Sequence, residues 1–161
     1  MGKSYLGKEL ARLLGFAFAD LDAVIEEKAG MAVAAIFKEM GETVFREMEA
    51  ACLRGFGNEQ RIVVATGGGT PCFHQNLDWM NEHGITVFFF ASPAVLVGRL
   101  EAEKDKRPLL AALNPAEVVA FIEKKLQERA VYYNRCHLQF NVPERGLEGV
   151  SSLADYLRRF F

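Results

Sequence analysis

The start of the chain carries residues that could bind a phosphate group. Gly2, Lys3 and Ser4 directly precede a helical pattern and match the last part of the phosphate-loop motif G-x-x-x-x-G-K-S/T. In the complete motif, backbone N–H groups and a helix N-terminus surround the phosphates, the lysine contacts the β and γ oxygens, and the hydroxyl binds Mg²⁺. Three residues are a weak signal, and an ordinary helix start with a solvated lysine explains them equally well.

Two carboxylates follow a predicted strand over residues 16–20. Asp20 and Asp22 are two positions apart, so they point to the same side of an extended backbone. One could hold Mg²⁺ through water or accept a proton from a hydroxyl, and the other could accept hydrogen bonds from the hydroxyls of a ligand. The alternative is a turn in which Asp22 caps the next helix, which explains one aspartate well but two less readily.

An arginine and a glutamate lie three positions apart in a predicted helix. Arg46 and Glu49 are therefore neighbours on its surface. The usual meaning of this spacing is an exposed ion pair, which this segment alone favours. The functional alternative is an arginine that Glu49 orients, so that its planar guanidinium binds a substrate carboxylate through two hydrogen bonds.

Three consecutive glycines, Gly67, Gly68 and Gly69, follow a short apolar run at residues 62–65. Such a run is typical of a strand that is covered on both faces. Three glycines weaken any regular element, so we expect them where the backbone turns tightly or where a ligand touches it. A plain flexible turn remains the alternative.

Two further arginines are candidates for binding an anion. Arg107 lies in a charged, proline-bearing segment at residues 104–110. This segment is either a solvated connection or a lid that closes over a phosphate during its transfer. Arg129 is either an exposed helix residue or a second residue that binds a carboxylate.

The totals limit the classes of function. The 161 residues are expected to form one domain that spans the whole chain. The net charge of -2 argues against a general nucleic-acid binder. The 3 cysteines are scattered, which favours free thiols in the cytoplasm over a disulfide framework or a zinc site. The N-terminal residues do not resemble a signal peptide, and apolar runs such as residues 85–91 are too short to cross a membrane.

Helical and strand patterns alternate along the chain, without a linker or a repeat. Gly15 is placed to end the first helix, and Asn114 begins a late helix with the pattern of a capping box. The predicted helices cover residues 6–14, 22–56 with interruptions near Gly30 and Gly41, 75–82, a segment from Ser92, 114–133, and a terminal segment from Ser151 or Ser152. The predicted strands cover residues 16–20, 62–65, 85–90 and 137–141.

This alternation predicts an α/β fold in three layers, with a central parallel sheet between helices on both faces. In such folds the functional groups gather at the carboxyl ends of the strands. Three polar clusters follow predicted strands here, at residues 20–22, at 66–69 and from Asn141 onward. Their shared position is a first indication of a site.

Taken in order, these segments resemble the shikimate kinase family over essentially the whole chain. The shared features are G-K-S, D-x-D after the second family strand, F-R-x-x-E, the G-G-G turn, R-P-L in the lid segment, and a late R-A-x-x-Y. Each is weak to moderate alone, but their order and spacing are specific. The G-G-G turn together with F-R-x-x-E distinguishes this family from adenylate, gluconate and other small P-loop kinases. The resemblance implies a P-loop fold like that of nucleoside monophosphate kinases, with a lid at about residues 104–115.

The resemblance implies transfer of a phosphoryl group from ATP to the 3-hydroxyl of shikimate in aromatic amino-acid biosynthesis, with Mg²⁺ as cofactor. The implied partners are these two small molecules, without nucleic acid or membrane, and the protein is expected to be a cytoplasmic monomer. Carried over position by position, the resemblance implies that the catalytic residues are Lys3, Asp20 and Arg107. It implies that shikimate binds to Asp22, Arg46, Gly67, Gly68, Gly69 and Arg129. It implies that the nucleotide binds to Gly2, Lys3, Ser4, Arg107 and Arg145, and the metal to Ser4 and Asp20.

The sequence departs from the family pattern at its start. Family members have a hydrophobic strand and a complete G-x-x-G-x-G-K-S/T loop, whereas Met1 directly precedes Gly2 here. A protein without both parts is expected to have a destabilised sheet and weak ATP binding, because the strand is central and the loop glycines form much of the phosphate site. Two alternatives to a shikimate kinase remain: a kinase for another small hydroxylated acid, and a non-catalytic protein that keeps the shikimate pocket.

Overall fold

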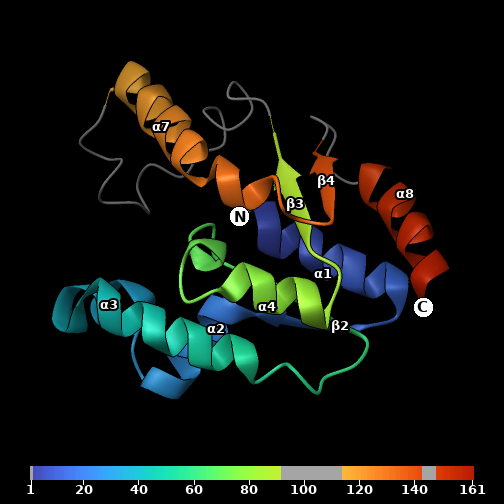
Figure 1. Cartoon of the computed structure of the whole chain (residues 1–161), viewed down its shortest axis with the longest axis horizontal. Helices are drawn as coiled ribbons and strands as arrows, with labels where there is room; N and C mark the ends of the chain where they lie inside the picture. The colour runs from blue at the N-terminus through green and yellow to red at the C-terminus, as the bar shows by residue number, and fades with distance from the viewer. Residues whose placement is uncertain (1, 92–113, 143–147) are drawn as a thin grey trace. The chain divides into compact units, whose positions relative to one another are not determined.

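The computed structural model describes residues 2–91, 114–142 and 148–161 (Figure 1). The chain divides into two compact units, one formed by residues 1–85 and 145–161 and the other by residues 86–144. Helices and parallel strands alternate in both units, as the sequence predicts.

The first unit contains a pair of parallel strands and helices from both ends of the chain. In order, its elements are α1 (Gly2–Leu14), β1 (Ala17–Asp20), α2 (Leu21–Ala29), α3 (Val33–Arg54), β2 (Ile62–Ala65), the 3₁₀ turn η1 (Thr70–Cys72), α4 (Asn76–His83), α8 (Glu148–Leu157) and the 3₁₀ turn η3 (Arg158–Phe160). Most of the residues with predicted chemistry in this unit follow short strands or lie in the first turn of a helix, whereas Arg46 lies within α3.

Two glycines divide the long helical segment that the sequence predicts between residues 22 and 56. Gly30 has a left-handed backbone with φ 67°, and its N–H donates to the carbonyl of Glu26 at the end of α2. Gly41, with φ 85° and ψ 167°, interrupts α3 and joins two helical segments. Residues with a Cβ seldom adopt a positive φ, which explains why both positions hold glycine. The predicted interruptions are confirmed.

Strands β1 and β2 pair in parallel, from Ala17 opposite Ile62 to Asp20 opposite Ala65. Parallel pairing brings the carboxyl ends of both strands to the same edge, so Asp20 and the segment that follows Ala65 lie next to each other. Helix α1 packs on both strands. Gly7 permits this close approach, because a Cβ there would lie 2.9 Å from the ring of Phe18.

A hydrophobic core holds α2 and α3 together and receives side chains from α4. Burial of one large aliphatic or aromatic side chain contributes about 1.5–3 kcal/mol, so this cluster is a major source of stability for the first unit. The fully buried members are Leu21, Ile25, Ile36, Phe45, Cys52 and Leu53, and Trp79 and Met80 pack against them. The core fixes the half of α3 that carries Arg46 and Glu49.

Helix α8 packs against α1, so the two ends of the chain meet in the first unit (Figure 1). After α8, the guanidinium of Arg158 donates a hydrogen bond to the carbonyl of Leu13 near the end of α1. The ring of Phe161 packs edge-on against Phe16, with ring centroids 5.2 Å apart. The C-terminal residues therefore stabilise the helix that opens with the predicted phosphate-binding residues.

The second unit consists of β3 (Val87–Phe90), α7 (Pro115–Tyr133) and β4 (Leu138–Asn141). The two strands pair in parallel. Asn114 and Glu117 form the predicted capping box, in which each side chain accepts the backbone N–H of the other over 2.9 and 2.8 Å. The ring of Phe88 stacks on Tyr133 with centroids 4.1 Å apart and holds the end of α7 against β3.

Several predicted element boundaries differ from the structure by one to four residues. The terminal helix begins at Glu148 and not at Ser151 or Ser152, and both serines are exposed positions within it. Serine is tolerated in an exposed helix interior as well as at a cap, so its presence does not by itself mark a helix start. The strand predicted at residues 85–90 begins at Val87. The helix predicted from Ser92 lies outside the described residues.

Candidate active site

The first turn of α1 contacts the end of β1 through a direct hydrogen bond. The hydroxyl of Ser4 donates to Oδ2 of Asp20 over 2.5 Å. The other carboxylate oxygen of Asp20 accepts the backbone N–H of Asp22 over 3.1 Å, so Asp20 caps α2. The alternative in which Asp22 is the capping residue is therefore wrong. Asp22 lies in the first turn of α2 and not in the strand, so the expectation from alternating strand side chains is also wrong.

The oxygen atoms of Ser4 and Asp20 suit a magnesium ion. Mg²⁺ prefers hard oxygen ligands and is commonly held by one or two protein groups together with substrate phosphates. Within the described part of the chain, no group of three or more His, Cys, Asp or Glu residues is placed to hold a metal. A metal at this point would need further ligands besides Ser4 and Asp20.

Asp22 is half-buried next to other acidic groups. Burial raises the pKa of its carboxyl group, and the charges of Asp20 and Glu49 raise it further, whereas the charge of Lys3 lowers it. A carboxylate in these surroundings gains more than an exposed one from nearby hydrogen-bond donors. Asp22 is therefore suited to accept hydrogen bonds from the hydroxyl groups of a ligand.

Arg46 and Glu49 form an ion pair that is buried and not exposed. Nη1 of Arg46 donates to Oε2 of Glu49 over 2.8 Å, and the two side chains are 11% and 1% exposed. Nε and Nη2 of Arg46 also donate to Oε1 of Glu42 over 3.2 Å. The usual interpretation of this spacing as a surface ion pair is wrong. The pair fixes the plane of the Arg46 guanidinium.

The glycine turn lies directly against this pair. A Cβ at Gly69 would be 2.7 Å from Nη2 of Arg46, so a side chain there would displace the guanidinium. A Cβ at Gly67 would be 3.4 Å from Oε1 of Glu49 and 3.8 Å from Oδ1 of Asp22. The residue after the turn, Thr70, donates its hydroxyl to Oε1 of Glu49 over 2.6 Å. The glycines thus leave room for the polar side chains that surround them, with Gly68 between.

Three aromatic rings lie close to the Arg46 guanidinium, and only Phe45 among them belongs to a predicted motif. Its Cζ lies 4.4 Å from the ring centroid of Phe73, 5.1 Å from that of Phe45 and 5.8 Å from that of Phe37. Phe37 and Phe73 are partly exposed, at 36% and 37%. Rings at this distance attract a guanidinium and limit its movement. Phe45 directly precedes Arg46, so the sequence indicates that contact. Phe73 is far from Arg46 in the sequence, and no local pattern indicates its contact.

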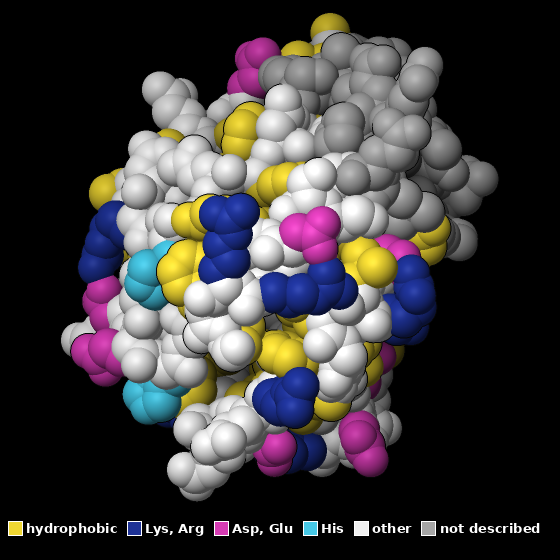
Figure 2. All heavy atoms as spheres, turned by 90° about the vertical axis from the view of Figure 1, so that its right-hand side faces the viewer, with side chains coloured by type: hydrophobic (Ala, Val, Ile, Leu, Met, Phe, Trp, Pro, Cys, Tyr) yellow, Lys and Arg dark blue, Asp and Glu magenta, His cyan; other side chains and the backbone are white. Residues whose placement is uncertain are grey.

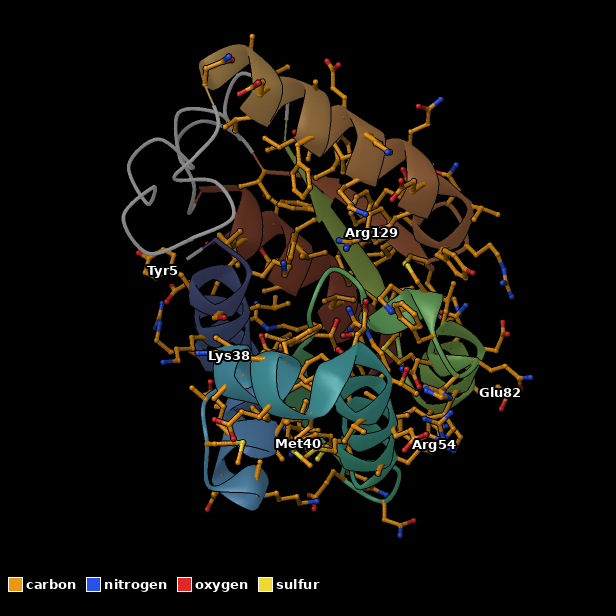
Figure 3. The ribbon with its side chains drawn as sticks, turned by 90° about the vertical axis from the view of Figure 1, so that its left-hand side faces the viewer. Tyr5, Lys38, Met40, Arg54, Glu82 and Arg129 are labelled. Carbon is orange, nitrogen blue, oxygen red and sulfur yellow. The ribbon has the colours of Figure 1, made fainter. Side chains whose placement is uncertain are left out.

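The structure brings together Gly2, Lys3, Ser4, Asp20, Asp22, Arg46 and the Gly67–Gly69 turn in the first unit. Arg129 lies on α7 in the second unit (Figure 3), and its predicted role stays a prediction. Arg107, Arg145 and the lid up to residue 113 lie outside the described residues, so their predicted roles also stay predictions.

The surface of the described residues carries charges of both signs. On the face shown in Figure 2, lysine and arginine side chains are interspersed with aspartate and glutamate. Among the described helices, none has the length and apolar composition needed to cross a membrane.

Comparison with known proteins identifies the family. The family model described as shikimate kinase matches residues 1–150. The chain belongs to the shikimate kinase family. A shikimate kinase of Phocaeicola vulgatus is 43% identical over 143 residues, which cover 89% of this chain and 82% of that protein. One of Bacteroides fragilis is 43% identical over 136 residues, which cover 84% of this chain and 76% of that protein.

Solved structures of this family share the fold. The crystal structure of a shikimate kinase from Bacteroides thetaiotaomicron superposes with a TM-score of 0.89 at 38% identity, covering 99% of this chain and 91% of the other. A shikimate kinase from Acinetobacter baumannii in complex with shikimate superposes with a TM-score of 0.82 at 30% identity, covering 99% of this chain and 86% of the other. The predicted α/β fold of the P-loop kinase type is confirmed. Membership of the family also confirms the resemblance inferred from the ordered motifs.

Proposed function

We propose that this chain is a shikimate kinase that transfers the γ-phosphoryl group of ATP to the 3-hydroxyl of shikimate. The observation that carries this proposal is the buried pair of Arg46 and Glu49 against the glycine turn. The hydrogen bonds to Glu42 and Glu49 use the N–H of Nε and one N–H on each terminal nitrogen of Arg46. Each terminal nitrogen has a second N–H, and a guanidinium with two such donors suits the carboxylate of shikimate.

The acidic residues at the end of β1 supply the complementary part of the acceptor site. Asp22 accepts hydrogen bonds from shikimate hydroxyls, which offset the cost of its burial. Asp20 would lie near the metal and the reacting hydroxyl, and its carboxylate would accept the proton of that hydroxyl. A rigid ring that carries a carboxylate and several hydroxyls is thereby held at both ends. Gly67, Gly68 and Gly69 line the same pocket.

Phosphoryl transfer depends mainly on in-line positioning and on positive charge near the transferred group. Lys3, in the first turn of α1, supplies positive charge to the phosphates, and Gly2 offers its backbone at the same helix N-terminus. Ser4 and Asp20 would hold Mg²⁺, which would supply further positive charge at the phosphate oxygens. The resemblance to the family assigns Arg107 and Arg145 to the nucleotide and Arg129 to the carboxylate of the acceptor.

We place the reaction in aromatic amino-acid biosynthesis, in the cytoplasm, with the protein acting as a monomer. The free thiols of Cys52, Cys72 and Cys136 suit a reducing compartment. Shikimate and ATP are then its partners.

A coupled assay of ADP release with shikimate, ATP and Mg²⁺ tests the proposal. We expect turnover that depends on all three, and loss of acceptor affinity in the Arg46→Ala variant. A folded sample with no turnover above the buffer rate would contradict the proposal. A panel of other small hydroxylated acids, compared by kcat/KM, would show a different acceptor if the site were built for one. If shikimate raised the melting temperature while Mg·ATP had no effect, the protein would be a binding module and not a kinase.

A further inference from the structure

The polar side chains that are buried in the described part of the protein form one connected group. They belong to Glu49, Thr70 and Asn76, each with 0% exposure. Burying a polar group is costly unless its hydrogen bonds are satisfied, so such groups persist where they fix a particular geometry. Among the described residues, no buried side-chain nitrogen or oxygen lacks a hydrogen-bond partner.

Hydrogen bonds connect this group to Arg46, and Glu49 accepts from both sides. The amide of Asn76 donates to the backbone carbonyl of Thr70 over 2.9 Å. The hydroxyl of Thr70 donates to Oε1 of Glu49 over 2.6 Å, and Oε2 of Glu49 accepts from Arg46 over 2.8 Å. The position of Asn76 is thus transmitted through Thr70 and Glu49 to the guanidinium of Arg46.

The group ends at Arg54, on the last turn of α3 next to α4 (Figure 3). Nη1 of Arg54 donates to Oδ1 of Asn76 over 2.7 Å and to the carbonyl of Ala50 over 3.0 Å. Its Nη2 donates to the carbonyl of His74 over 2.7 Å. Arg54 lies eight positions after Arg46, which is about 12 Å along a helix, so it does not belong to the acceptor pocket itself.

Arg54 also holds a strained piece of backbone. His74 and Gln75 both have a left-handed backbone, with φ of 48° and 55°, although neither is glycine. Such residues persist only where their surroundings hold them in place. The bond from Arg54 to the carbonyl of His74 does this directly before Asn76, the first residue of α4.

We infer that Arg54 is a positioning residue for the acceptor site, acting through Asn76, Thr70 and Glu49 on Arg46. This inference rests on the proposed function, since the readout is the affinity for shikimate. Arg54 and α3 hold Asn76, Asn76 fixes the backbone of Thr70, and Thr70 fixes one oxygen of Glu49. The position of Oε2 of Glu49 is then fixed as well, and with it the position of the Arg46 guanidinium that it binds.

Steady-state kinetics of variants in the otherwise intact protein test the inference. Arg54→Met and Thr70→Val should each raise the KM for shikimate by roughly three- to thirtyfold, as residues along a coupled network do. The KM for ATP should change less than about twofold. Thr70→Ser keeps the hydroxyl and should behave like the wild type. Arg12→Met is the matched control, because Arg12 is 68% exposed and pairs only with Glu9 among the described contacts.

The double variant Arg54→Met/Thr70→Val distinguishes a network from two separate effects. If Arg54 acts through Thr70, the KM of the double variant should equal that of Thr70→Val, because that substitution already breaks the path. The inference would be overturned if the increase in shikimate KM of the double variant were the product of the two single increases. It would also be overturned if Arg54→Met had the same shikimate KM as the Arg12→Met control.

The inference can still be tested if the Arg54→Met variant does not fold or if the wild type has no shikimate turnover. If Arg54→Met did not fold, equal shikimate KM values for Thr70→Val and Thr70→Ser would overturn it instead. A wild-type protein without shikimate turnover would refute the proposed function. Calorimetric titration of shikimate with the same variants would then still decide the inference, and unchanged dissociation constants would overturn it.

Discussion

Replacing Gly69 by alanine tests whether the glycine turn exists to make room for the Arg46 guanidinium. The added Cβ would lie 2.7 Å from Nη2 and 3.1 Å from both Cζ and Nη1 of Arg46. An unstrained contact needs about 3.5 Å, so the guanidinium must move by roughly 0.8 Å. The backbone of Gly69, with φ −89° and ψ −19°, suits alanine, so strain in the main chain does not contribute.

We expect the Gly69→Ala variant to fold and to lose acceptor affinity. A displacement near 1 Å costs up to about a hundredfold in a preorganised site, so the KM for shikimate should rise by roughly ten- to a hundredfold. Initial rates of ADP release, with shikimate and ATP varied separately, measure both KM values. Gly84→Ala is the matched control, because the nearest atom to a Cβ there is the carbonyl oxygen of Met80 at 4.0 Å. A folded Gly69→Ala variant with the wild-type KM for shikimate would refute the steric argument.

Glu49→Gln removes the charge of a side chain that is 1% exposed and leaves Arg46 without its buried partner, so the free energy of unfolding should fall by about 2–4 kcal/mol in urea titrations. A loss below about 0.5 kcal/mol would show that the pair is not buried as described. Asp22→Asn removes a carboxyl group whose pKa is raised in the folded state, mainly by burial. Such a group stabilises the fold below its unfolded-state pKa and loses that contribution as the pH rises through its folded-state pKa. The melting temperature of Asp22→Asn should therefore exceed that of the wild type at about pH 8, and the difference should disappear toward about pH 4. A difference in melting temperature that does not vary with pH would contradict the raised pKa. Lys3→Ala should lower kcat by at least about tenfold with little effect on the KM for shikimate, whereas Lys8→Ala on the same helix should not, and equal kcat values for the two variants would exclude a role of Lys3 in the transfer.

Local sequence signals predicted much of the fold. The capping box at Asn114 and the glycines at positions 15, 30 and 41 mark helix ends or breaks, because each depends on a few adjacent residues. The start of α8 was predicted three or four residues too late, because serines resemble caps wherever they occur. Strand order and the division into two units depend on contacts between distant segments, which a single sequence does not state.

The candidate site was predicted in composition but not in geometry. The i, i+3 spacing revealed that Arg46 and Glu49 are neighbours, but not that they are buried, since burial depends on the glycine turn and on Phe73. The hydrogen bond between Glu49 and Thr70 joins residues 21 positions apart, and no local pattern predicts it.

Through the contact between α8 and α1, the far end of the chain supports the helix on which the proposed phosphate-binding residues lie. Deleting Arg158–Phe161 would remove both the bond to the Leu13 carbonyl and the ring packed on Phe16. This deletion would destabilise α1, the helix that carries Lys3 and Ser4. Shortening the C-terminus would thus weaken ATP affinity and spare the acceptor residues on α2 and α3, and a purification tag is better separated from Phe161 by a flexible spacer.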